Sequence, residues 1–179
     1  MTKLVWDIDG VLRDLNKGLR LRYKLPYPII WDWKDKDGFD VYDYVNKDLT
    51  VLEEAPPTKF VSVLQKYLGK DKYIELWSNQ PDSWKPYTIR WLNKYFNKYD
   101  IKYFTPIEKE FNLLISEKNM LLVDDYPRFK NYDYVIVVDQ PYNQHVICRG
   151  RLKHVRQLKD ILKHFNIYCG ELPNEKVGI

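Results

Sequence analysis

The sequence predicts an α/β fold in which a parallel sheet lies between two layers of helices. Short apolar runs alternate along the chain with segments whose apolar residues recur at helical spacing. The short runs are largely apolar and do not alternate with polar residues, which is typical of strands buried on both faces of a parallel sheet. At 179 residues the chain fits one such domain with a small insertion.

Five apolar runs are predicted to be strands: residues 3–6, 73–77, 101–104, 120–123 and 134–138. Helical spacing predicts helices over residues 16–23, 59–68, 84–96, 108–117 and 151–165. Thr58 and Ser83 are the expected N-caps of the second and third helices. In the fourth helix Phe111, Leu114 and Ile115 are expected to face inward. The predicted architecture is therefore a three-layer, Rossmann-like parallel sheet.

Residues 15–57 differ in composition from the rest of the chain. Prolines interrupt this stretch after its first helix, Pro56 and Pro57 close it, and aromatic residues are interleaved with Asp, Lys and Gly. Such a segment suits a small, mainly helical cap inserted after the first strand. The core is then expected to comprise residues 1–14 and 58–170, and residues 171–179 form a polar tail.

The charge and cysteine content narrow the class of protein. The net charge of +4, from 29 basic and 25 acidic residues, suits an anionic small-molecule ligand and does not require nucleic acid. Cys148 and Cys169 have neither metal-site spacing nor a disulfide framework. Because no stretch resembles a signal peptide or a membrane span, we expect a cytoplasmic protein without a membrane partner. A monomer and a homodimer are both compatible with the sequence.

Side chains that could take part in binding or catalysis follow the ends of three predicted strands, and one such lysine lies just beyond another strand. They are Asp7, Asp9, Gly10, Ser78, Asn79, Lys109, Asp124 and Asp125. Each of them could by itself be a turn, cap or surface residue without a functional role. A parallel sheet, however, would bring all of them to one edge. Three carboxylates can hold Mg²⁺ together with a phosphate oxygen, and a hydroxyl, an amide and a lysine can hold the other phosphate oxygens. One carboxylate can then attack phosphorus while a neighbour handles the proton.

This order of residues resembles the haloacid-dehalogenase-like (HAD) phosphatase superfamily over residues 3 to about 139. Within that superfamily the chain is most similar to the 5'(3')-deoxyribonucleotidases. The finer resemblance lies in Asp7-Ile-Asp-Gly-Val-Leu-Arg-Asp14, Trp91-Leu-Asn-Lys-Tyr-Phe96, Tyr103-Phe-Thr-Pro-Ile-Glu-Lys109, Leu121-Leu-Val-Asp-Asp-Tyr-Pro127 and Gln140-Pro-Tyr-Asn143.

The resemblance implies a role for each of these acidic residues. Asp7 is the nucleophile that forms an aspartyl-phosphate, and Asp9 protonates the leaving oxygen and then activates water. Mg²⁺ is held by the Asp7 side chain, the Asp9 backbone carbonyl and Asp124. Asp125 is expected beside these metal ligands.

The resemblance also implies a phosphate-binding set. Ser78 and Lys109 bind the phosphoryl oxygens, with Asn79 and the Gly10 backbone nearby. Lys118 is the alternative to Lys109 as the phosphate-binding lysine.

The expected activity is Mg²⁺-dependent hydrolysis of (deoxy)nucleoside monophosphates. Trp31, Trp33 and Phe39 are the cap residues expected to lie over the base, although they could equally pack the cap itself. Two alternatives remain open at this point. One is a phosphatase acting on nucleic-acid ends or another small phosphate ester, and the other is a non-catalytic nucleotide-binding module with the same fold.

Overall fold

The computed structural model describes residues 3–26, 33–68, 73–115, 120–132, 134–148 and 150–164. In these residues six parallel strands form one sheet in the order β3-β2-β1-β4-β5-β6. The strands are β1 (Lys3–Trp6), β2 (Tyr73–Ser78), β3 (Lys98–Tyr103), β4 (Met120–Asp124), β5 (Val135–Val138) and β6 (Gly150–Leu152). The chain therefore has the three-layer α/β architecture expected from its apolar runs.

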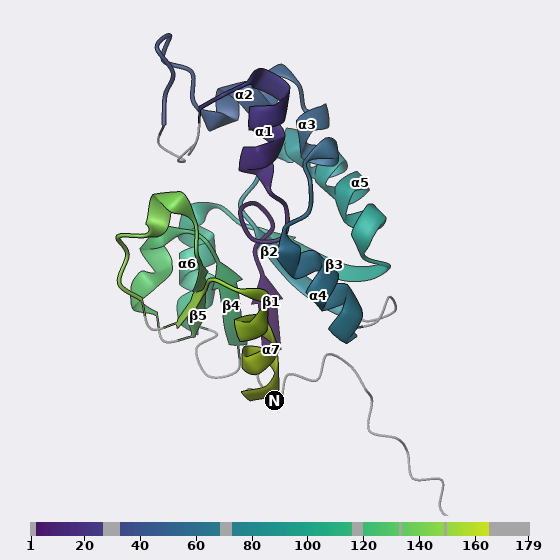
Figure 1. Ribbon diagram of the computed structural model, residues 1–179, viewed down its shortest axis with the longest axis vertical. Coiled ribbons are helices and arrows are strands. Elements are labelled where there is room, and N and C mark those ends of the chain that lie inside the picture. The colour runs from purple at the N-terminus through teal and green to yellow at the C-terminus, as the bar shows by residue number, and fades with distance from the viewer. Residues whose placement is uncertain are drawn as a thin grey trace, which may run out of the picture.

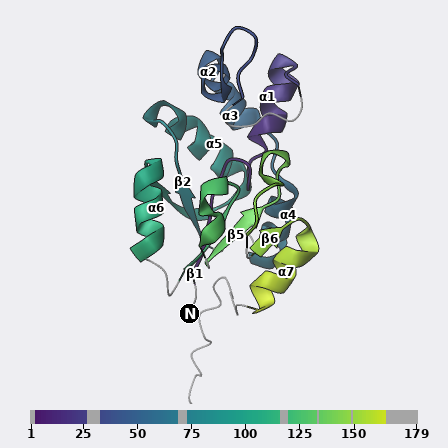
Figure 2. The same ribbon diagram turned by 90° about the vertical axis from the view of Figure 1, so that its left-hand side faces the viewer.

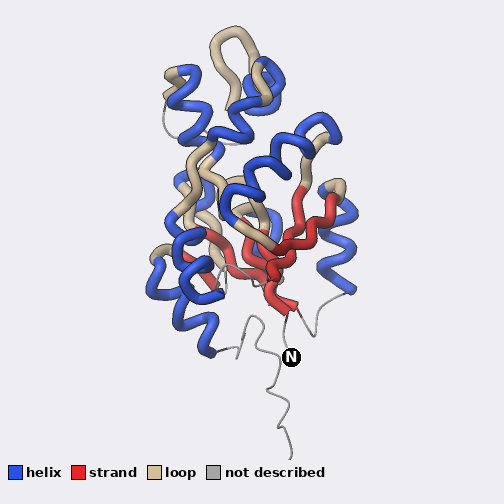
Figure 3. Tube along the Cα trace, turned by 90° about the vertical axis from the view of Figure 1, so that its right-hand side faces the viewer, coloured by secondary structure: helices blue, strands red, loops and turns tan. Residues whose placement is uncertain are grey.

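Helices cover both faces of the sheet (Figures 1 and 3). One face packs on α4 (Lys59–Leu68), α5 (Lys85–Tyr95) and α7 (Val155–His164), and the other on α6 (Pro106–Ile115) and the 3₁₀-helix η2 (Pro127–Asn131). Side chains along β1 point alternately to the two layers, so Trp6 lies in the first apolar cluster and Val5 in the second. Burial on both faces explains why β1, β4 and β5 are apolar almost throughout, whereas the partly exposed edge strand β3 carries Lys and Asp.

Three further helices lie beyond the carboxyl ends of the strands (Figure 2). They are α1 (Leu15–Tyr23), α2 (Val41–Lys47) and α3 (Thr50–Glu54), and we call them the α1–α3 segment. Asp14 begins α1 by accepting a hydrogen bond from the Lys17 backbone N–H (3.0 Å). The segment has its own apolar cluster, which also takes in Trp84 from the 3₁₀-helix η1 (Asp82–Trp84). Its definition as a separate cap stays a prediction.

Two expectations about the helix ends were wrong. The last helix begins at Val155, not at Arg151, and residues 150–152 form a sixth strand. A strand of three residues is too short to show the alternation by which a strand can be predicted. Arg151 lies in this strand, and its guanidinium group donates hydrogen bonds to Asp139 and Asn143. Ser83 is not an N-cap: it lies inside η1, and α5 follows without a side-chain cap.

Helix α6 buries a different face from the one that its apolar residues predict. Phe111, Leu114 and Ile115 are exposed by 60%, 43% and 66% of their surface. The buried residues are Lys109 and Leu113, one helical turn apart. The helix is therefore oriented by a buried lysine, which a hydrophobic pattern cannot reveal.

None of the described helices is long and apolar enough to cross a membrane.

Candidate active site

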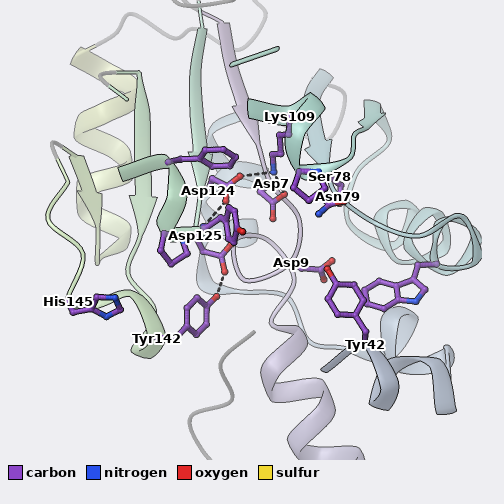
Figure 4. Close-up of a pocket in the computed structure, with 15 residues that line it drawn as sticks. Asp7, Asp9, Tyr42, Ser78, Asn79, Lys109, Asp124, Asp125, Tyr142 and His145 are labelled. Atoms are coloured by element: carbon purple, nitrogen blue, oxygen red, sulfur yellow. Dashed lines mark hydrogen bonds and ion pairs between the residues drawn. The ribbon is translucent and has the colours of Figure 1, made fainter. Parts of the chain in front are cut away.

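A cavity of about 580 Å³ opens at the carboxyl ends of the strands, facing the α1–α3 segment (Figure 4). Ligands of parallel α/β proteins bind at this edge, where loops rather than strands carry the side chains. The cavity is lined by Asp7, Asp9, Tyr42, Ser78, Asn79, Trp84, Pro106, Lys109, Asp124, Asp125, Tyr126, Pro127, Phe129, Tyr142 and His145. The sheet thus brings together the acidic residues, Ser78, Asn79 and Lys109 that the sequence placed at its edge.

Asp7, Lys109 and Asp124 form the floor of the cavity. The Lys109 ammonium lies 2.6 Å from Asp7 Oδ1 and 2.6 Å from Asp124 Oδ2, bridging the ends of β1 and β4 (Figure 4). The backbone N–H of Asp7 continues the ladder to the Val123 carbonyl (2.9 Å), which fixes the chain direction at the strand end. All three side chains are buried, so the attraction of Lys109 to each carboxylate is strong, and so is the repulsion between Asp7 and Asp124.

Gly10, Asp125 and Tyr142 form a tight unit beside this floor. Gly10 has a φ of +78°, and a Cβ at this position would lie 2.0 Å from Asp125 Oδ2 and 2.8 Å from the Tyr142 hydroxyl. The Tyr142 hydroxyl donates to Asp125 (Figure 4). Gln140 Nε2 donates to the Gly10 carbonyl (2.5 Å), so the loop after β5 is tied to the turn after β1. Glycine is required here both for its backbone conformation and for the space it leaves.

The loop that carries Tyr142 is held by a buried asparagine. Asn143, in the 3₁₀-helix η3 (Pro141–Asn143), donates to the Asp125 carbonyl (2.9 Å) and the Val138 carbonyl (2.8 Å). Arg151 Nη1 donates to Asn143 Oδ1 (2.9 Å). These contacts place Tyr142 and His145 at the edge of the cavity.

The electrostatics of the acidic cluster favour added positive charge. Burial raises the pKa of Asp7 well above its ordinary value, in spite of the ion pair with Lys109. Burial and the charge of Asp124 raise the pKa of Asp125 to about 7. Burial by itself would lower the pKa of Lys109, but Asp124 and Asp7 raise it above its ordinary value. One lysine therefore faces three carboxylates that cannot all ionise without cost.

The donor set fits a divalent cation. Asp7, Asp124 and Asp125 each offer a carboxylate oxygen, and these atoms lie within 4.8 Å of one another. Hard oxygen ligands of this kind suit Mg²⁺, whose charge would also balance the excess of carboxylates. Asp125 therefore belongs to the cluster itself. The part expected of the Asp9 backbone carbonyl stays a prediction.

The Asp9 side chain is turned away from this cluster. It lies on the α2 side of the cavity (Figure 4), and both of its oxygens accept hydrogen bonds from Arg13. Arg13 had no predicted role. Its charge was visible in the Asp7–Asp14 stretch, but its complete burial was not.

The aromatic residues at the cavity are not those expected from the sequence. Trp33 and Phe39 pack around Tyr44, with ring centroids 6.0 and 6.4 Å from it, and neither lines the cavity. Trp31 lies outside the described residues, as does Lys118. Tyr42 lines the cavity instead, stacked on Trp84 at 5.2 Å with an angle of 29° between the rings.

The position of helix α2 explains why Tyr42, and not Trp33 or Phe39, lines the cavity. Tyr42 is at its first turn, and Asn46 one turn later accepts a hydrogen bond from Trp84 Nε1 (2.8 Å). The helix is thereby attached to η1, with Tyr42 toward the cavity. Trp33 and Phe39, which precede α2, contact Tyr44 instead, and Lys47 Nζ is 3.8 Å from the Phe39 ring centroid.

The fold is that of HAD-superfamily hydrolases. A HAD-superfamily hydrolase of subfamily IA from Geobacter sulfurreducens aligns with a TM-score of 0.52 at 14% identity, over 90% of this chain and 96% of its own. The putative HAD-hydrolase YfnB from Bacillus subtilis, solved with bound magnesium, aligns with 0.51 at 12% identity over 90% and 98%. A dehalogenase solved as an intermediate complex aligns with 0.53 at 10% identity over 96% and 98%. No family model and no curated protein sequence matches the chain.

Proposed function

We propose that this chain is a Mg²⁺-dependent phosphomonoesterase that hydrolyses (deoxy)nucleoside monophosphates, as the 5'(3')-deoxyribonucleotidases do. The observation that carries the proposal is the floor of the cavity, where Asp7 contacts Lys109 and lies in one cluster with Asp124 and Asp125. A carboxylate next to a lysine and a cation site can approach a phosphoryl group that the same positive charges attract.

Asp7 attacks phosphorus in the first half-reaction. A bond forms between its carboxylate oxygen and phosphorus, the bond to the leaving oxygen breaks, and that oxygen takes a proton from Asp9. Lys109 and the Ser78 hydroxyl bind phosphoryl oxygens, and Asn79 adds an amide at the edge of the cavity. Mg²⁺, bound by Asp7, Asp124 and Asp125, would supply positive charge that offsets the phosphate and lets Asp7 ionise.

Water attacks in the second half-reaction. Asp9, now ionised, takes a proton from water as the water oxygen bonds to phosphorus. The bond between phosphorus and Asp7 breaks, which releases inorganic phosphate and restores the carboxylate. The nucleoside has already taken the first proton, so Asp9 ends the cycle protonated as it began.

The aromatic wall supports a nucleotide as the substrate. Tyr42 presents a ring beside Asp9, with Trp84 behind it, so a planar base attached to a phosphate at Asp7 would have a surface to stack on. A volume of about 580 Å³ is typical of small-molecule sites and suits one nucleotide rather than a strand end.

The test is phosphate release from a panel of nucleoside 5'- and 3'-monophosphates with added Mg²⁺ or with EDTA. We expect turnover of at least one deoxynucleotide with Mg²⁺, and loss of that turnover with EDTA, because the carboxylate cluster then lacks its balancing charge. A 3'-phosphorylated oligonucleotide is the comparison substrate. Faster turnover of the oligonucleotide, or binding of nucleotide without any hydrolysis, would contradict the proposal.

Replacing Tyr42 by leucine should weaken nucleotide binding selectively. Stacking on one ring is worth about 1–3 kcal/mol per base, so KM for the nucleotide should rise about tenfold. KM for glycerol phosphate, which has no ring, should stay unchanged. Phe39→Leu is the matched control, because Phe39 belongs to the Tyr44 group outside the cavity and should affect neither substrate. An equal effect of Tyr42→Leu on both substrates would show that Tyr42 only shapes the cavity.

A further inference from the structure

Arg13 is completely buried and holds the Asp9 carboxylate with both arms of its guanidinium group. Its Nε donates to Asp9 Oδ1 (2.7 Å) and its Nη2 donates to Asp9 Oδ2 (3.0 Å). A guanidinium group is planar and its donors are fixed, so a paired contact of this kind sets the plane and direction of a carboxylate as well as its charge.

Arg13 is in turn held by two helices outside the cavity, α3 and α5. Its Nη1 donates to the Leu52 carbonyl on α3 (2.8 Å) and to Thr88 Oγ1 on α5 (3.1 Å), and its guanidinium carbon lies 5.7 Å from the centre of the Trp91 ring. All the nitrogen atoms of the guanidinium group thus have partners, as a buried arginine requires. The contacts leave Arg13 a single orientation.

A second path leads from Asp9 back to the same threonine. Gln80 Nε2 donates to Asp9 Oδ2, and Gln80 Oε1 accepts from the Thr88 hydroxyl (2.8 Å). Asp9, Arg13, Thr88 and Gln80 therefore form a closed ring of buried hydrogen bonds. Each member is hydrogen-bonded to two others, so a shift of any one of them is expected to change the direction of the Asp9 carboxylate.

Arg13 does not line the cavity, whereas Asp9 does. It therefore cannot touch a substrate and can affect the reaction only through Asp9. We propose that Arg13 is a positioning residue that, with Gln80 and Thr88, directs the Asp9 carboxylate for proton transfer with the leaving oxygen. This inference rests on the proposed function, which assigns the proton transfer to Asp9. Through Arg13, the position of the Asp9 carboxylate also depends on the packing of α3 and α5.

The experiment compares two substrates with different leaving groups at saturation and measures release of the leaving group in a single turnover. This rate excludes the second half-reaction, in which Asp9 activates water for either substrate. A nucleoside monophosphate leaves as an alkoxide and needs a proton, whereas p-nitrophenyl phosphate leaves as a stable phenolate and does not. Arg13→Lys keeps the charge and loses the planar fork. We expect its single-turnover rate of nucleoside release to fall up to about 100-fold, and its rate of p-nitrophenolate release to fall at least tenfold less, since misplacing a catalytic group by about 1 Å has effects of this size.

Thr88→Val disrupts the ring of hydrogen bonds without removing a direct contact of Asp9. It is the variant that tests the inference if Arg13→Lys does not fold. It removes the hydroxyl that joins Arg13 to Gln80 and should show the same selectivity at smaller size. Arg90→Lys is the matched control: Arg90 also joins α5 to α3, through Glu53 (2.6 Å), but has no contact with the ring and should affect neither substrate.

Asp9→Asn separates failure of the inference from failure of the proposed function. If Asp9→Asn is selective for the nucleotide but Arg13→Lys and Thr88→Val slow both substrates equally, or neither, the ring is only structural and the inference is overturned. If Asp9→Asn slows the single-turnover release of both leaving groups equally, Asp9 does not protonate the leaving oxygen, and that step of the proposed mechanism is overturned together with the inference.

Discussion

Asp7→Asn should abolish phosphate release while leaving the fold intact. We expect kcat to fall by about 10⁴-fold or more, the scale on which hydrolases lose activity with their nucleophile, because an amide does not attack phosphorus. Burial raises the pKa of Asp7, so it disfavours the ionised form of this carboxyl in the metal-free protein. The variant without metal should therefore unfold at the same temperature as the unmodified protein or a higher one, measured by circular dichroism.

Asp139→Asn is the matched control for this prediction. Asp139 also follows a parallel strand and forms an ion pair, with Arg151 at 2.8 Å, but it lies outside the cavity. Its replacement should leave kcat within a factor of about two, as expected for a group that contacts neither substrate nor metal. Residual turnover by Asp7→Asn above a few per cent would assign the attack on phosphorus to another group.

Lys109→Met should destabilise the metal-free protein strongly. It would leave three carboxylates buried together without their lysine, and removing one partner of a buried ion pair costs about 3–5 kcal/mol. The loss should be larger at pH 8 than at pH 5, because burial raises the pKa of Asp125 to about 7 and the carboxyl is protonated at the lower pH. The native state then holds more protons than the unfolded chain, so its stability falls as the pH rises.

Urea unfolding with and without Mg²⁺ measures this effect. Added Mg²⁺ should recover part of the lost free energy of unfolding, because a ligand that binds the native state stabilises it by mass action. Lys102→Met is the matched control: Lys102 is half exposed and lies 3.3 Å from Glu75, so it should change the stability by less than about 1 kcal/mol. Lys118→Met tests the alternative lysine. A larger loss of stability and activity in Lys118→Met than in Lys109→Met would reverse the assignment.

The residues at the candidate active site could be predicted from the sequence because they lie at the ends of strands. Asp7, Ser78 and Asp124 each follow an apolar run, and a parallel sheet must bring such positions to the same edge. The apolar runs also predicted the sheet itself, since strands buried on both faces carry few polar residues. Only β6, with three residues, was too short to leave a pattern.

The aromatic residues of the α1–α3 segment could not be assigned in this way. Composition shows that the segment is rich in rings, but not which of them faces the cavity. The orientation of α2 depends on contacts with Trp84, which lies far from it in the chain: a hydrogen bond to Asn46, the stacking of Tyr42, and the packing of Val41 and Val45 in the same apolar cluster. These contacts place Tyr42 at the cavity and leave Phe39 with Tyr44.

The sequence by itself determined the fold class, the edge of the sheet that carries the chemistry, and the residues gathered there, because these follow from local apolar runs and what comes after them. Tertiary structure decided how buried charges are paired. Lys109 turns α6 so that Phe111 faces solvent, and Arg13 enters the interior to hold Asp9. The physical reason is that a charged residue is buried only where its partners meet it, and those partners lie on other elements of the fold.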